Sequence, residues 1–242
     1  MPLPRRALII TAALLLATVA SLAREASADS WYFRTILHDD FSSREAGILP
    51  VTANDRYQFS YEGGEYVVRR LDTAVGMLTP PLLQSTHADA VMAVDVRFPD
   101  NVALEAAGLW CRRAVTANEP QTGYRLVIDP YNRFIRLTRA DTDGMVELAS
   151  GRSAAFTSGT AWNRIALSCV GSTITVTING VRVAGVEDTT YRSGYLALIT
   201  NVFAGAPTTT YEIHFDNLDV SVPTDLPYHL TVPPNVSVGE TP

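Results

Sequence analysis

The sequence predicts an all-β protein, folded as a two-sheet antiparallel β-sandwich. Short segments in which apolar and polar residues alternate recur about twelve times, with turn residues between them. Outside the amino-terminal leader, no segment has the apolar period of an amphipathic helix. The stretch from Trp162 to Val183 contains two alternating strands and an Asn-Gly turn, which is typical of a β-hairpin. Many short strands joined by turns are typical of a sandwich.

The first 28 residues have the pattern of a secretory signal peptide. Arg5 and Arg6 precede an apolar run over residues 7–20, and the small-residue sequence ASA occupies 26–28. An uncleaved membrane anchor is the alternative, but this run is shorter than the roughly 20 residues that span a bilayer. The pattern therefore predicts cleavage after Ala28, a secreted or extracytoplasmic location in the cell envelope, and no membrane insertion of the mature chain.

The rest of the chain divides into one domain and a tail. Residues 29–222 have the length and the strand patterns of a single β-sandwich domain. Residues 223–242 are rich in proline and have no sheet period, so we expect a flexible tail there. All 19 basic residues are arginines and the net charge is −6, which disfavours nucleic acid and anionic membranes as partners.

The first half of the domain reads as strands and hairpins in order. A first strand is expected over residues 36–43 and a loop over 44–54. Residues 56–61 and 65–71 form a hairpin around Glu62-Gly63-Gly64. Further strands are expected at 90–98, 107–114, 124–129, 133–139 and 145–148.

The second half contains the clearest register information. Asn179-Gly180 suits a type I′ turn, which would place Ile178 opposite Val181 and Val176 opposite Val183. A strand follows at 195–200. In the last strand, apolar residues move from odd to even positions near Asp216-Asn217, which predicts a β-bulge there.

The chain has two cysteines, Cys111 and Cys169, both inside predicted strands. In an exported protein such a pair is expected to form a disulfide. Closing a loop of 58 residues would stabilise the fold by about 4 kcal/mol in the chain-entropy model. The alternative is two buried free thiols.

A family resemblance rests on short motifs in a fixed order. They are HDDFS at 38–42, EYVV at 65–68, GLWCR at 108–112, WNRIALSCVG at 162–171, ING at 178–180 and FDNLDV at 215–220. Together they resemble exported bacterial domains of the concanavalin A-like lectin/glucanase superfamily, similar to family-16 glycoside hydrolases or the 3-keto-disaccharide hydrolase domain. The resemblance implies a jelly roll with one concave sheet, and it supports a bond between Cys111 and Cys169.

Catalytic machinery of that superfamily is not recognisable in the sequence. Family-16 enzymes carry their two carboxylates on one strand as E-x-D-x-x-E or a near variant, and no such motif is present. The pairs Glu62/Glu65, Asp141/Asp143 and Asp216/Asp219 fall in turns or across the expected bulge, where solvated carboxylates are common. A carboxylate pair contributed by different strands remains the alternative. The histidines lack metal-ligand spacing, and no serine lies in G-x-S-x-G.

Candidate ligand-binding residues lie on the strand that holds Cys111. Trp110 and Arg112 are expected on the face opposite Leu109 and Cys111, where an exposed Trp can stack on a sugar ring and Arg can donate to hydroxyls. The alternative places Trp110 beneath a loop or between the sheets. Tyr131, in a turn, is a further candidate, and Phe203, in a loop, is another.

A structural Ca²⁺ near Asp40 and Asp216 is a second hypothesis, because first and last strands often pair in sandwiches and carboxylates suit this ion. The alternative gives Asp216 a capping role in the bulge. The function expected is a secreted module that binds carbohydrate, such as a cell-envelope glycan, or another surface ligand. A glycoside hydrolase-like enzyme and a structural or adhesive envelope protein are the alternatives.

Overall fold

The computed structural model describes residues 32–45, 47–72, 77–99, 105–116, 119–202 and 211–224. The predicted leader over 1–28, the tail beyond residue 224 and Phe203 lie outside these ranges. Within them every regular element is a β-strand, and none of the described segments is a helix with the length and hydropathy to cross a membrane.

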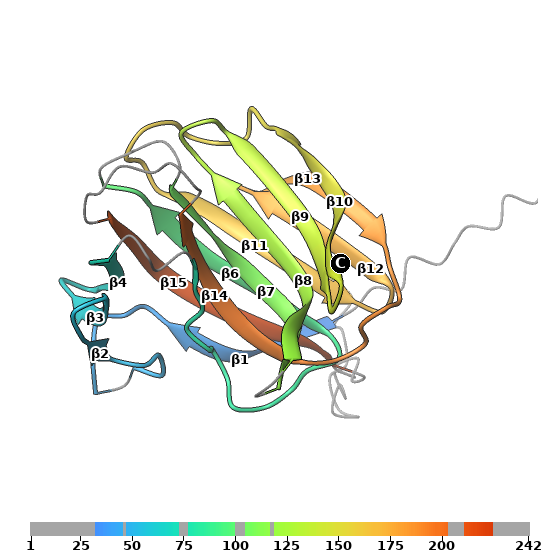
Figure 1. The fold of residues 1–242 in the computed structure, drawn as a ribbon, viewed down its shortest axis with the longest axis horizontal. Coiled ribbons are helices and arrows are strands. Elements are labelled where there is room, and N and C mark those ends of the chain that lie inside the picture. Colours follow the sequence, from blue (N-terminus) through green and yellow to red (C-terminus); the bar gives the residue numbers. More distant parts are fainter. Residues whose placement is uncertain are drawn as a thin grey trace, which may run out of the picture. The chain divides into compact units, whose positions relative to one another are not determined.

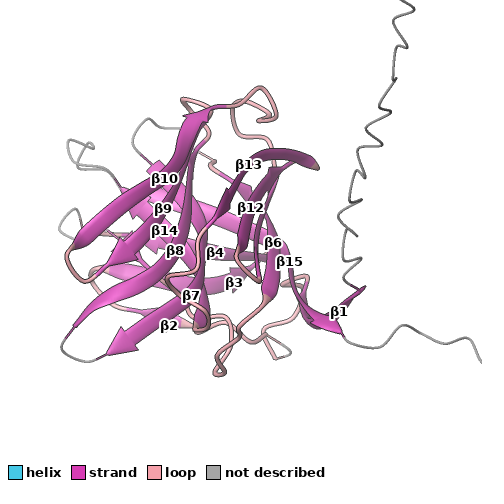
Figure 2. Cartoon of the chain, turned by 90° about the vertical axis from the view of Figure 1, so that its right-hand side faces the viewer, coloured by secondary structure: helices cyan, strands magenta, loops and turns pink. Residues whose placement is uncertain are grey.

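The described residues form fifteen strands in two antiparallel sheets that pack face to face (Figure 1, Figure 2). The strands are β1 (Tyr32–Asp39), β2 (Thr52–Ala53), β3 (Tyr57–Glu62), β4 (Glu65–Arg70), β5 (Met77–Leu78), β6 (Ala90–Arg97), β7 (Glu105–Thr116), β8 (Glu119–Asp129), β9 (Phe134–Asp141), β10 (Gly144–Arg152), β11 (Asn163–Val170), β12 (Thr173–Ile178), β13 (Val181–Glu187), β14 (Tyr195–Val202) and β15 (Tyr211–Thr224). The nine-stranded sheet has the order β13-β12-β11-β6-β15-β4-β3-β2, with β1 paired to β15. The six-stranded sheet has the order β10-β9-β8-β7-β14-β5. The predicted all-β two-sheet sandwich is confirmed.

The core lies between the two sheets and follows the period of two seen in the sequence. In β6 and β11, buried and partly buried residues alternate without interruption. Ile165 and Leu167 from the larger sheet, and Leu109 and Leu126 from the smaller, are fully buried there. Apolar residues at alternate positions therefore specify which face of each strand turns inward.

The hairpin of β12 and β13 confirms one predicted pair and corrects another. Asn179 and Gly180 have φ angles of 49° and 80°, as a type I′ turn requires, and Ile178 lies opposite Val181. The prediction that Val176 faces Val183 is wrong, because the register shifts between Val176 and Thr177 and pairs Val176 with Ala184. One extra residue on β13 forms a bulge that the turn sequence does not reveal.

The last strand contains the predicted bulge. Its pairing with β6 shifts between Asp216 and Asp219, and Asn217 has a φ of 50°. β15 also runs two residues beyond the predicted domain limit at 222, with Pro223 opposite Phe33 and Thr224 opposite Tyr32. Proline is tolerated here because it lies at the end of the strand.

The disulfide between Cys111 and Cys169 is present and joins the two sheets. Cys111 belongs to β7 of the smaller sheet and Cys169 to β11 of the larger, with a Cα–Cα distance of 6.6 Å. Both sulfurs lie in the core, since the two residues are at most 1% exposed. The bond therefore fixes the spacing of the sheets at one place in the sandwich.

Replacing both Cys111 and Cys169 by alanine is expected to lower the free energy of unfolding by about 4 kcal/mol, because the unfolded chain loses a 58-residue cross-link. Urea denaturation of the double variant, beside wild type with and without dithiothreitol, measures the loss. Thiols in the native wild-type protein that react with iodoacetamide without reductant would contradict the bond.

Candidate functional site

The outer face of the six-stranded sheet carries three rows of side chains that cross the strands. The face is the one opposite Leu109, Leu126 and Leu137, which point into the core. Cross-strand pairing defines the rows as Trp110–Arg125–Thr138–Glu147, then Gly108–Val127–Arg136–Ser150, then Asp129–Phe134–Arg152. Neighbours within a row have side chains close enough to touch, so each row offers a combined surface.

One hollow lies on this face at the ends of β8 and β9. It has a volume of about 380 Å³ and is lined by Val127, Asp129, Asn132, Phe134, Arg136 and Arg152; we call it the β8–β9 hollow. Asp129 accepts hydrogen bonds from the backbone N and the Nδ2 of Asn132, at 3.0 and 2.7 Å. The Arg136 guanidinium lies 5.5 Å from the centre of the Phe134 ring and pairs with Glu147 at 3.3 Å.

Tyr131 lies beside this hollow, in the turn that joins β8 to β9. Its side chain is 55% exposed and lines a second hollow of about 430 Å³ together with Asn132, Arg133 and Arg152. Asn132 and Arg152 border both hollows. The exposed ring of Tyr131 could therefore contact a ligand bound in either hollow.

Trp110 occupies the predicted face, but the expectation that it is exposed is wrong. The side chain is 1% exposed, because the guanidinium groups of Arg113 and Arg125 cover its ring at 5.2 and 5.0 Å from the ring centre. Cation–π attraction and the apolar stems of both arginines favour this arrangement. The alternation of residues along β7 predicts the correct face for Trp110. It gives no information about the two arginines that cover the ring.

Arg112 does not share the face of Trp110, so its predicted position is wrong. Ala197 pairs with Trp110, whereas Tyr195, two residues earlier, pairs with Arg113. β7 therefore contains one extra residue, and Arg112 is the bulged one, with a φ of 51°. The bulge places Arg113 on the outer face and turns Arg112 away from it.

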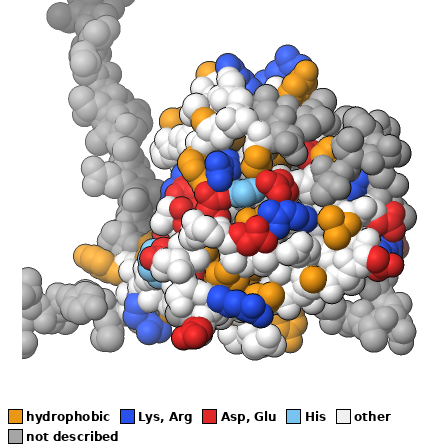
Figure 3. Space-filling view, turned by 90° about the vertical axis from the view of Figure 1, so that its left-hand side faces the viewer, with side chains coloured by type: hydrophobic (Ala, Val, Ile, Leu, Met, Phe, Trp, Pro, Cys, Tyr) orange, Lys and Arg blue, Asp and Glu red, His pale blue; other side chains and the backbone are white. Residues whose placement is uncertain are grey.

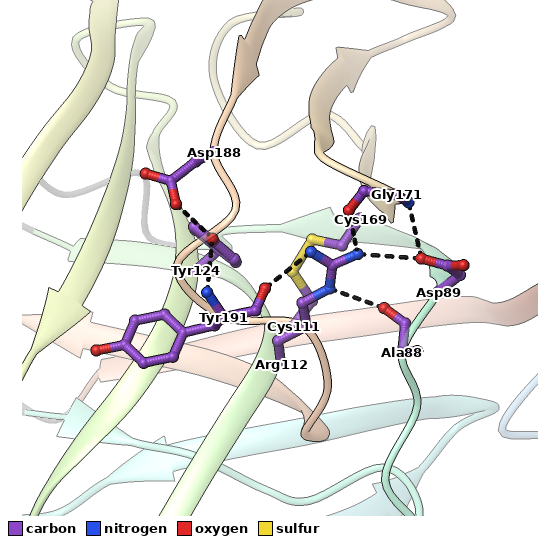
Figure 4. The surroundings of a disulfide bond; sticks show 9 residues. All are labelled: Ala88, Asp89, Cys111, Arg112, Tyr124, Cys169, Gly171, Asp188 and Tyr191. Atoms are coloured by element: carbon purple, nitrogen blue, oxygen red, sulfur yellow. Dashed lines mark hydrogen bonds and ion pairs between the residues drawn. A yellow bond between two sulfur atoms is a disulfide. The ribbon is translucent and has the colours of Figure 1, made fainter.

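Arg112 instead forms hydrogen bonds with several chain segments at the end of the sandwich, beside the disulfide (Figure 4). Its guanidinium donates to the carbonyl oxygens of Ala88, Tyr191 and Gly171 at 2.7–2.9 Å. It also donates to Asp89 at 3.0 Å, and the residue is only 2% exposed. Because Nε, Nη1 and Nη2 all have protein partners, Arg112 is a structural residue and has little capacity left for a ligand.

A carboxylate network continues this end of the sandwich. Asp188 accepts hydrogen bonds from the hydroxyl of Tyr124 and from Nη1 of Arg139, both at 2.6 Å. Burial alone would raise the pKa of Asp188, but the hydrogen bonds from Tyr124, Thr190 and Arg139 outweigh it and lower the pKa to about 2. The charged form of Asp188 therefore stabilises the folded state.

A larger ionic network covers the outer face of the nine-stranded sheet, and the sequence interpretation missed it. His214 contacts Glu65 through Nδ1 and Glu212 through Nε2, and Arg97 pairs with Glu65 at 2.7 Å. Arg69 pairs with Glu212 at 2.8 Å. Figure 3 shows such a cluster of histidine, arginine and carboxylate side chains. The alternation Glu212-x-His214-x-Asp216 was the available signal, since alternate residues of a strand share a face.

Two of the carboxylates considered for catalysis form ion pairs with arginines. Glu62 straddles the turn with Glu65, as predicted, and hydrogen bonds from Arg69 and Ser60 lower the pKa of Glu62 to about 2. Asp141 accepts from Arg139 at 2.9–3.1 Å and from the Tyr191 hydroxyl at 3.0 Å. Both carboxylates therefore have firm arginine partners.

The two residues of the calcium hypothesis have local partners. Asp40 accepts from the backbone N and Oγ of Ser42, and these bonds lower its pKa. Asp216 accepts from the backbone N of Asn217, as expected for a bulge, while burial and the charges of nearby carboxylates raise its pKa. Among the described residues, no group of three or more acidic, histidine or cysteine side chains is placed to hold a metal ion. The calcium site stays a prediction.

Comparisons with known proteins identify the fold. No family model and no curated protein sequence matches the chain. Solved structures do match, among them a protein of unknown function with a galectin-like fold from Bacillus subtilis, with a TM-score of 0.60, 12% identity and coverage of 80% of this chain and 100% of that one. The κ-carrageenase zobellia_236 from Zobellia galactanivorans matches with a TM-score of 0.58 and 10% identity, over 82% and 98% of the two chains.

The carbohydrate binding module CBM66 from Bacillus subtilis matches with a TM-score of 0.54 and 12% identity, over 71% of this chain and 99% of that one. At these identities the similarity concerns the fold. The chain thus has a concanavalin A-like jelly-roll fold, in agreement with the resemblance found in the sequence, and shares this fold with carbohydrate-binding modules and glycoside hydrolases.

Replacing Asp188 by asparagine is expected to destabilise the protein at neutral pH and progressively less in acid. The pKa of Asp188 is lower in the folded than in the unfolded chain, so its charge stabilises the fold above about pH 4 and this contribution disappears as the pH falls to about 2. Urea denaturation of wild type and D188N at several pH values measures the difference, expected to be about 2 kcal/mol at pH 7. A difference independent of pH would contradict the charged network.

Proposed function

We propose that the protein is a secreted, non-catalytic module that binds carbohydrate through the β8–β9 hollow and the adjoining turn at Tyr131. The observation that carries this proposal is the composition of the hollow. It combines an aromatic ring, Phe134, with the guanidinium groups of Arg136 and Arg152 and the carboxylate of Asp129. Sugar recognition needs an apolar surface for the ring face together with donors and acceptors for hydroxyls, and these residues supply both.

The rigidity of the lining supports binding. Asp129 is held by two hydrogen bonds from Asn132, whereas Arg136 contacts Phe134 and forms a half-exposed ion pair with Glu147. These side chains project from neighbouring strands, whose positions the ladder fixes. A preformed site of this kind loses little conformational entropy when a ligand binds.

The carboxylate content of the hollow's described lining favours binding over hydrolysis. Glycoside hydrolysis needs two carboxyl groups on either side of the scissile bond. Among the described residues that line the β8–β9 hollow, Asp129 is the single carboxylate, and its oxygens accept from Asn132. The fold, shared with a carbohydrate-binding module, agrees with this proposal, and the leader-like residues 1–28 support secretion.

Replacing Phe134 or Arg152 by alanine is expected to weaken glycan binding about tenfold, because each change removes one stacking surface or one charged donor. A printed array of neutral and acidic glycans identifies a bound saccharide, and calorimetry with that saccharide measures the affinities. Arg34, exposed on β1 of the other sheet, provides a matched control as Arg34→Ala, which should bind as wild type does.

The same experiment separates the alternatives. Binding that survives both substitutions in the hollow would place the site elsewhere. An array on which no glycan binds would favour a structural or adhesive role in the envelope. Release of reducing sugar that is abolished by Asp129→Asn would establish an enzyme instead of a binding module.

A further inference from the structure

Two buried arginines on the outer face of the six-stranded sheet have no acidic partner among the residues that the structure describes. Arg113 and Arg125 are 7% and 6% exposed, and neither forms a salt bridge with any described residue. Arginine stays protonated in proteins, so both positions hold a positive charge. Burying a charge without a counter-charge is costly, and native proteins rarely keep such an arrangement without use.

The protein partners of the two guanidinium groups are neutral. Arg113 donates to Oε1 of Gln121 at 3.0 and 3.2 Å and to Oγ1 of Thr79 at 3.1 Å. Arg125 donates through Nη1 to the sulfur of Met145 at 3.3 Å, a weak acceptor, and its Nε has no acceptor among the described residues. Burial lowers the pKa of both arginines, as expected where no carboxylate compensates it.

A cavity borders Arg125 and Trp110, while Arg113 adjoins its lining through Trp110 and Gln121. It has a volume of about 340 Å³, and Trp110, Gln121, Arg125, Asp141 and Thr142 are among its lining residues. The indole Nε1 of Trp110 is buried and has no acceptor among the described residues. Asp141 is the carboxylate of this lining, and its oxygens already accept from Arg139 and Tyr191. The cavity therefore presents unused donors and an uncompensated positive charge.

The surrounding face has more arginines than carboxylates, although the chain as a whole is acidic. In its rows and at the bulge, Arg113, Arg125, Arg136 and Arg152 stand against Asp129 and Glu147. On the other sheet, the arginines at the centre of the outer face are paired with carboxylates. The excess of positive charge is thus local to the face that carries the β8–β9 hollow.

We propose that Arg113 and Arg125, stacked on Trp110, form an anion subsite for the carboxylate or sulfate group of an acidic saccharide. Arg125 is two residues from Val127 and four from Asp129 along β8, so the subsite lies about 7 to 13 Å from the lining of the β8–β9 hollow, at the rise of an extended strand. A short oligosaccharide spans this distance. The inference rests on the proposed function for the saccharide, whereas the anion subsite itself rests on the arginines.

The first experiment tests the anion subsite without any glycan. Sodium sulfate is expected to raise the melting temperature of wild type by about 3 °C beyond sodium chloride at equal ionic strength, because it binds the folded state. Sulfate also stabilises folded proteins in general, so the Arg125→Met variant, which keeps the apolar stem and removes the charge, should show a clearly smaller sulfate shift than wild type while its stability in chloride stays equal or rises. The Arg34→Met variant on the other sheet should retain the sulfate effect.

A purely structural Arg125 gives the opposite pattern: Arg125→Met is destabilised in chloride, and sulfate stabilises wild type and both variants alike. That outcome would overturn the anion subsite. Arg113→Gln provides a second variant, which keeps polar contacts with Gln121 and Thr79 if Arg125→Met fails to fold.

The second experiment compares dextran with dextran sulfate, and polygalacturonate serves as the carboxylate probe. We expect wild type to bind at least one of the acidic polymers, Arg125→Met to bind it about tenfold more weakly, and dextran to bind weakly or not at all. A sulfate-dependent shift without binding of any polymer would keep the anion subsite and refute the saccharide as its source. Neutral glycan binding that requires Phe134, without a sulfate shift or acidic preference, would refute the subsite and leave the proposed function intact.

Discussion

The bulge at Arg112 determines the directions of two neighbouring arginine side chains at the end of the sandwich. In a regular strand Arg112 would share the outer face with Trp110 and Arg113 would point inward. The extra residue instead lets Arg112 form hydrogen bonds at the end of the sandwich and places Arg113 over Trp110 on the outer face. Because Cys111 precedes the bulge and bonds to Cys169, the same segment also joins the two sheets. The positions of Arg112 at the end of the sandwich and of Arg113 on the candidate face are therefore set by one extra residue in β7, directly after the covalent link.

Two glycines make this bulge possible. A Cβ atom on Gly123, which has a φ of 121°, would lie 2.6 Å from the carbonyl oxygen of Arg112, and one on Gly194 would lie 2.3 Å from its carbonyl carbon. Backbone approaches this close leave no space for a side chain. The neighbouring strand β8 and the segment before β14 thus pack closely against the backbone of Arg112. The carbonyl oxygen of Tyr191 accepts a hydrogen bond from the Arg112 guanidinium.

The strand patterns predicted the fold because the inward faces of the central strands are mostly apolar. Ile165, Leu167 and Cys169 show this, as does the bulge at Asn217, where a change of apolar phase is visible in the sequence. The bulge at Arg112 leaves no such trace, since Arg112 and Arg113 are identical residues and either could take the outer position. The face of Arg112 was predicted wrongly for that reason. The burial of Trp110 depends on Arg125 from another strand, a contact that local alternation does not encode.

The outer faces of the two sheets differ in whether their arginines are paired with carboxylates. On the nine-stranded sheet, His214, Glu65, Glu212 and their arginines neutralise one another, which lowers the pKa values of the carboxylates and stabilises the folded state. On the six-stranded sheet, Arg113 and Arg125 are buried against an indole and neutral groups. Charges that are compensated within the chain need no ligand, whereas a buried charge left uncompensated gains most from an external anion.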